Sequence, residues 1–123
     1  MRRLASEPTT ATLTTDRNPR PPTDDDPQLE AMMLYLVRMD VTLPEGLSPE
    51  ERAELLAREK AYSQDLQRDG RWKEIWRVVG EYANYSVFDV ADHDELHGLL
   101  AGLPLFPHMR ISVTPLATHP SHI

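Results

Sequence analysis

Apolar residues in the region from residue 33 onward follow the short period of β-strands in four places. Tyr, Trp, Val, Ile and Phe are concentrated there, and turns that contain Gly or Pro separate the segments. The pattern predicts strands over 33–41, 72–79, 82–90 and 109–115.

Two stretches between these strands have helical character instead. Ser48 is followed by Pro49 and, three residues on, by Glu51, which is the pattern of a capping box at a helix N-terminus. Good helix formers continue to residue 69, and Gly70 ends the run. A second, shorter helix is expected over 92–101. The resulting order is βαββαβ, which predicts an α+β, ferredoxin-like fold: an antiparallel sheet with two helices on one face, of the dimeric α/β-barrel type.

Bulky apolar side chains are expected on both faces of this sheet. Strict alternation places Trp72 and Trp76 on one face and Ile75 and Val79 on the other. Because the two helices cover only one face, apolar residues on the uncovered face predict self-association into a homo-oligomer. The alternative is the ordinary scatter of apolar residues on a protein surface.

The first 32 residues differ in composition from the rest. They hold 5 of the 11 prolines and none of the aromatic residues, together with the run Asp24-Asp25-Asp26. We interpret 1–32 as a disordered extension or as the product of a mis-assigned start, since Met32 and Met33 follow directly. The single domain then spans 33–123 and ends in a tail, 116–123.

Charge and cysteine content narrow the class of protein. The net charge is −7 without any basic block, so nucleic acid is not an expected partner. The chain has no cysteine, which excludes disulfides and thiolate chemistry and favours the cytoplasm. The longest apolar run, 31–37, is much shorter than a membrane span, and no secretory leader is evident, so no membrane association is expected.

One carboxylate lies on the apolar side of the long helix. At about 100° per residue, with Leu55 taken as zero, Leu66 falls near 20° and Glu59 near 40°, whereas the other acids of this helix form a separate solvated face. Burial would raise the pKa of Glu59 and suit it to act as a base near neutral pH. The alternatives are an ion pair with Arg52 or Arg77, or a place at the wet edge of the stripe.

The third predicted strand adds uncharged hydrogen-bonding groups. Alternation places Tyr82, Asn84 and Ser86 on one face. A phenol, an amide and a hydroxyl in a row suit a pocket that holds a carbonyl or stabilises a developing enolate. A plain solvent-facing strand surface is the alternative.

A metal site is not expected. His93 and His97 have the i, i+4 spacing of a helical metal pair, but no third ligand can be named for them and no glutamate of the zincin type lies between them.

Several separated motifs, in order, resemble the muconolactone Δ-isomerase family. They cover essentially all of residues 33–123 and none of 1–32. These motifs are Met33-Leu34-Tyr35-Leu36-Val37, Arg58-Glu59-Lys60, Gly80-Glu81-Tyr82-Ala83-Asn84-Tyr85-Ser86-Val87-Phe88-Asp89-Val90, Leu103-Pro104-Leu105-Phe106-Pro107 and His119-Pro120-Ser121.

The resemblance implies an enzyme of the β-ketoadipate pathway of aromatic degradation. Such an enzyme shifts a double bond in a small anionic lactone, converting muconolactone to 3-oxoadipate enol-lactone without a cofactor or metal. It also implies a large homo-oligomer, a decamer in this family, with the tail packed against a neighbouring subunit.

Roles for the candidate residues follow from the reaction that the resemblance implies. A 1,3-proton shift needs a base that removes a proton, stabilisation of the resulting dienolate, and an acid that returns the proton to another carbon. One carboxylate, Glu59, can both remove the proton and return it. Tyr82, Asn84 and Ser86 would donate hydrogen bonds to the lactone oxygen or the substrate carboxylate. A cation would bind that carboxylate, and the sequence does not rank the three candidates, Arg38, Lys60 and Arg77.

Two positions depart from the family pattern. Glu81 stands where a basic residue is expected and His108 where Tyr is usual, so either could alter substrate preference. Three alternative functions stay open beside the isomerase. They are a 5-chloromuconolactone dehalogenase, a small cofactor-free monooxygenase and a non-catalytic ligand-binding oligomer.

Overall fold

Residues 33–123 are the part of the chain that the structure, a computed structural model, describes. The expectation for 1–32 lies outside these residues. The elements are β2 (Met33–Val41), α1 (Pro49–Arg68), β3 (Trp72–Arg77), β4 (Ala83–Val90), α2 (His93–Ala101), the short 3₁₀ helix η2 (Phe106–His108) and β5 (Met109–Leu116). The predicted βαββαβ order is confirmed, and η2 is an addition to it.

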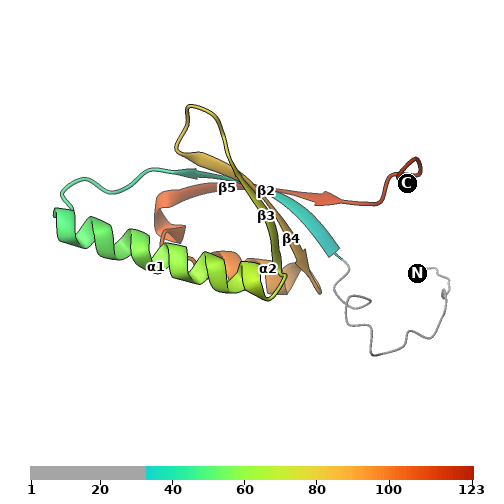
Figure 1. Ribbon diagram of the computed structural model, residues 1–123, viewed down its shortest axis with the longest axis horizontal. Helices are drawn as coiled ribbons and strands as arrows, with labels where there is room; N and C mark the ends of the chain where they lie inside the picture. The colour runs from blue at the N-terminus through green and yellow to red at the C-terminus, as the bar shows by residue number, and fades with distance from the viewer. Residues whose placement is uncertain (1–32) are drawn as a thin grey trace. The chain divides into compact units, whose positions relative to one another are not determined.

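The four strands form one antiparallel sheet in the order β3-β4-β2-β5. Both helices lie under the same face of this curved sheet (Figure 1). This arrangement confirms the ferredoxin-like α+β fold. We call the face that packs on α1 and α2 the helix face, and the opposite one the open face.

The start of α1 follows the local sequence. The Glu51 N–H donates to Ser48 Oγ at 3.1 Å and the Ser48 N–H donates to Glu51 Oε1 at 2.8 Å, so the predicted capping box is present. The strand β3 ends at Arg77, two residues earlier than predicted. Beyond it Gly80, with φ +81°, and the hydrogen bond from the Glu81 N–H to the Val78 carbonyl form the turn into β4.

The core lies between the helix face and the two helices. Alternate residues of β2 are buried there, and they pack with side chains from β3, β4, α1, α2 and the segment that follows α2. The buried members of this core are Tyr35, Val37, Met39, Leu66, Trp72, Phe88, Val90, Leu96, Leu100 and Leu103.

A β-bulge in β3 overturns one prediction about the two tryptophans. Trp72 pairs with Phe88 and Trp76 with Tyr85, and the register shifts between Trp72 and Glu74. The extra residue reverses the alternation, so Trp72 is buried on the helix face at 2% exposure while Trp76 lies on the open face at 53%. The expectation that they share a face was therefore wrong.

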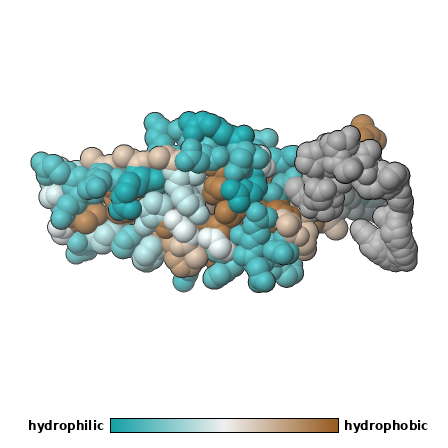
Figure 2. All heavy atoms as spheres, turned by 90° about the horizontal axis from the view of Figure 1, so that it is seen from below, coloured by the Kyte–Doolittle hydropathy of each residue, from teal (hydrophilic) through white to brown (hydrophobic). Residues whose placement is uncertain are grey.

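The open face carries apolar side chains, as predicted. All four strands contribute to them: Leu34 and Leu36 lie on β2, Trp76 on β3, Tyr85 and Val87 on β4, and Leu116 on β5. The helix-bearing side, by contrast, is largely hydrophilic where Figure 2 shows it. Neither of the two described helices has the length and apolar character to cross a bilayer.

Candidate active site

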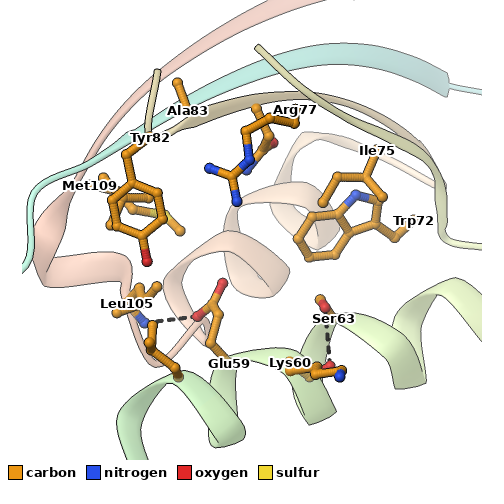
Figure 3. A pocket seen from close by; sticks show the side chains of 13 residues that line it. Glu59, Lys60, Ser63, Trp72, Ile75, Arg77, Tyr82, Ala83, Leu105 and Met109 are labelled. Carbon is orange, nitrogen blue, oxygen red and sulfur yellow. Dashed lines mark hydrogen bonds between the residues drawn. The ribbon is translucent and has the colours of Figure 1, made fainter. Parts of the chain in front are cut away.

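A pocket of about 310 Å³ lies between α1 and the helix face of the sheet, near the ends of β3 and β4 (Figure 3). This volume is at the small end of the range for small-molecule sites. Its lining comes from five elements and two of their connections: Val41, Leu56, Glu59, Lys60, Ser63, Trp72, Ile75, Arg77, Tyr82, Ala83, Asn84, Leu105 and Met109.

Glu59 occupies the α1 wall of this pocket. Its Oε1 accepts a hydrogen bond of 2.9 Å from the backbone N–H of Leu105, in the segment between α2 and η2. Its other carboxylate oxygen points into the pocket (Figure 3). Glu59 is half-buried and forms no ion pair with any residue of the described range 33–123. Neither a salt bridge to Arg52 nor one to Arg77 is present there.

The surroundings of Glu59 favour its protonated form. Removal from water raises the pKa of its carboxyl above the usual value, and the hydrogen bond from the Leu105 N–H opposes this rise only in part. The carboxyl is therefore closer to the pKa that suits a base acting near neutral pH.

Tyr82 and Arg77 face Glu59 across the pocket. The Tyr82 hydroxyl and the Arg77 guanidinium both point from the sheet toward α1 (Figure 3). The guanidinium carbon lies 5.3 Å from the centre of the Tyr82 ring, at stacking distance. The site thus combines a carboxylate, a phenol and a cation in one small volume.

Asn84 and Ser86 lie on the same face but at different depths. Asn84 lines the pocket, whereas Ser86 is fully buried and is not part of the lining. The Ser86 hydroxyl donates to Asn84 Oδ1 at 2.8 Å. The amide nitrogen of Asn84 is the donor that this side chain can offer to a ligand. Ser86, predicted as a direct donor, lies behind Asn84 instead.

The three candidate cations are separated by the fold. Lys60 and Arg77 line the pocket. Arg38 lies on the open face, because it alternates with the buried Val37 and Met39 along β2. There it pairs with Asp40 at 2.9 Å and Glu81 at 2.6 Å.

The two departures from the family pattern lie outside this pocket as well. Glu81 is the open-face partner of Arg38, and His108 lines a separate surface hollow that also contains Arg38 and Arg110. Neither residue is part of the lining around Glu59.

The sequence analysis did not identify the backbone donor, the Leu105 N–H, or the apolar side of the pocket formed by Trp72 and Ile75. The Leu105 N–H is invisible to any pattern of side chains, although Leu103-Pro104-Leu105 did stand out as a motif. Trp72 and Ile75 were assigned to different faces of the sheet, so their common place in one pocket was not foreseen.

The described residues, 33–123, contain no group of three or more His, Asp or Glu that could hold a metal ion. His93, half of the candidate pair, is hydrogen-bonded through Nδ1 to the Tyr35 hydroxyl. No residue of the pocket is therefore assigned to a metal.

Comparison with known proteins places this geometry in a family. The family described as muconolactone delta-isomerase matches residues 33–122. The Muconolactone Delta-isomerase of Cupriavidus pinatubonensis is 65% identical over 91 residues, covering 74% of this chain and 99% of that protein. The Muconolactone Delta-isomerase of Rhodococcus opacus is 56% identical over 92 residues, covering 75% and 99%.

A solved structure agrees with these relatives. The crystal structure of a muconolactone isomerase matches the fold with a TM-score of 0.70 at 50% identity, covering 74% of this chain and 95% of the other. The names of these proteins favour the isomerase over the dehalogenase, the monooxygenase and the non-catalytic oligomer. With its βαββαβ fold and a half-buried glutamate in the pocket under the sheet, the chain belongs to the muconolactone delta-isomerase family.

Proposed function

We propose that this protein converts muconolactone to 3-oxoadipate enol-lactone by a 1,3-proton shift. The observation that carries the proposal is Glu59, which has one oxygen fixed by the Leu105 N–H and the other directed into a small pocket. The 65% sequence identity to a protein named Muconolactone Delta-isomerase is the basis for the proposed substrate.

The proposed reaction needs only one acid–base group. Ionised Glu59 removes the proton from the ring carbon that bears the carboxymethyl group, and the C–H electron pair becomes part of a dienolate. The protonated carboxyl then delivers the same proton to the carbon next to the lactone carbonyl. One C–H bond breaks and one forms, so no co-reactant is consumed.

Donors on the sheet side would stabilise the charge that develops. The Tyr82 hydroxyl and the amide nitrogen of Asn84 are the groups that can donate to the lactone oxygen as it becomes an enolate. Arg77 is the preferred anchor for the substrate carboxylate, because its planar guanidinium faces the pocket and suits a carboxylate. Lys60, which is exposed, would add positive charge at the rim.

We also propose that the protein works as a homo-oligomer. The support is the apolar open face of the sheet, which neither helix covers, and the exposed Trp76 at its edge. The partner on this face would be a second copy of the same chain.

The function is tested by incubating the purified protein with muconolactone and following the ultraviolet spectrum. Wild-type protein should convert it, and Glu59→Gln should lose about 10²–10⁴-fold in kcat, because the amide keeps the shape of the side chain but cannot take up the proton. Glu54→Gln, an exposed glutamate of the same helix, is the matched control. Near-normal kcat in Glu59→Gln would remove Glu59 from the mechanism, and an inert wild type would refute the function.

A further inference from the structure

The pocket has two ends of different chemistry. Tyr82 and Arg77 lie at one end, and Trp72 and Ile75 lie side by side at the other, with Glu59 between the two pairs (Figure 3). The first end supplies hydrogen bonds and charge. The second end presents the Trp72 indole, whose buried Nε1 has no hydrogen-bond partner among the described residues, and the branched aliphatic side chain of Ile75.

The bulge in β3 creates the apolar end. Trp72 and Ile75 are three residues apart, so a regular strand would send them to opposite faces. The register shift between Trp72 and Glu74 instead brings both to the helix face, where Trp72 pairs with Phe88 and Ile75 with Ser86. Bulges are frequent beside active sites, where they redirect a side chain in this way.

Trp72 and Ile75, which form the two walls of this end, differ in how much of their side chain is buried. Trp72 is 2% exposed and packs on Phe88 with ring centres 4.7 Å apart. Ile75 is 39% exposed, so part of its apolar surface remains uncovered by the described residues. The exposed part of Ile75 is apolar surface that a ligand group can bury, and the tightly packed Trp72 ring bounds the same space.

We propose that Trp72 and Ile75 form a subsite for an apolar substituent on the lactone ring, so that the enzyme also accepts ring-methylated muconolactones. The inference rests on the proposed function, because the polar end must hold the lactone and carboxylate oxygens for the ring edge to face Trp72 and Ile75. A methyl group on either alkene carbon leaves in place the proton that Glu59 removes.

Because Ile75 is the less buried of the two residues, it is the one that determines this selectivity. Ile75→Phe adds volume at the exposed wall and should lower kcat/KM for methylated relative to unsubstituted muconolactone by about tenfold or more, within the range that one methyl-sized group controls. Because Ile75 lines the same pocket as Glu59, the readout is the ratio of the two kcat/KM values within each variant, and not the absolute rate with the unsubstituted lactone. Ile75→Ala, which removes the contact without filling the space, should lower the same ratio by about threefold.

The experiment measures kcat/KM for muconolactone and for the two forms methylated on an alkene carbon, with wild type, Ile75→Phe, Ile75→Ala and Val79→Phe. Val79, 94% exposed beyond the end of β3, introduces the same aromatic group away from the pocket and should leave the ratio unchanged. Wild-type turnover of muconolactone without turnover of either methylated form overturns the subsite and leaves the function standing. A ratio that neither Ile75 variant alters also overturns it. If wild type converts no lactone at all, the proposed function fails and the subsite fails with it.

Discussion

At the scale of single residues, Glu59 gains its chemical character from two opposing contacts. Burial raises the pKa of its carboxyl, and the Leu105 N–H limits that rise while holding one oxygen in place. The held oxygen fixes the direction in which the free oxygen points, so the Leu105 N–H sets the position of the carboxyl while burial raises its pKa.

The raised pKa predicts the pH dependence of turnover. The base must be ionised, so kcat/KM should fall as the pH drops through the pKa of Glu59, and this acid limb should lie above 4.5, the ordinary value for glutamate. A pH series of kcat/KM in the free enzyme measures it. An acid limb at or below the ordinary value would contradict the role given to burial.

Ser86 is predicted to act through Asn84. Ser86→Ala removes the hydrogen bond of 2.8 Å that orients the amide, and we expect kcat/KM to fall about tenfold, equivalent to about 1.4 kcal/mol. A double-mutant cycle with Asn84→Ala separates this role from simple destabilisation. In the Asn84→Ala background, Ser86→Ala should change kcat/KM little, and additive losses would argue against the positioning role.

At the scale of elements, α1 and β3 place the two sides of the pocket. The capping box sets where α1 begins, and the bulge decides which β3 side chains reach the helix face. The one extra residue in the bulge therefore decides which side chains of β3 line the pocket.

The capping box predicts a measurable share of the stability. Ser48→Ala should lower the free energy of unfolding by about 1 kcal/mol, because the Glu51 N–H loses its acceptor at the helix N-terminus. Urea denaturation measures the change. Glu51→Gln, which can still accept from the Ser48 N–H, is the matched control and should stay close to wild type; equal stability of all three proteins would contradict the prediction.

At the scale of the whole molecule, the apolar open face of the sheet is the surface through which we propose that copies of the chain assemble. Light scattering coupled to size-exclusion chromatography should give a mass several times the 14.0 kDa of one chain. Trp76→Glu places a charge on the open face and should shift the protein toward smaller species, because an unpaired carboxylate opposes burial. Gln67→Glu adds the same charge on the exposed side of α1 and should leave the mass unchanged. A monomeric wild type would refute the oligomer.

Much of this protein is determined by residues close together in the sequence. The order of strands and helices, the capping box and the place of Glu59 in the apolar stripe of α1 all follow from periodicity and local hydrogen bonding, which consecutive residues encode by themselves. The match between predicted and observed bounds is closest where such local features begin or end an element, as at Ser48 and Asp92.

Tertiary structure decided how these pieces combine into a site. The bond from Leu105 to Glu59 joins residues 46 positions apart, and the bulge that unites Trp72 with Ile75 shows only in the register with β4. The same packing hides Ser86 behind Asn84 and places Arg38 on the open face. The sequence alone determined the elements and the carboxylate, because these depend on neighbours along the chain. The pocket depends on which distant backbone groups and strand registers come together, and only packing of the whole fold sets those.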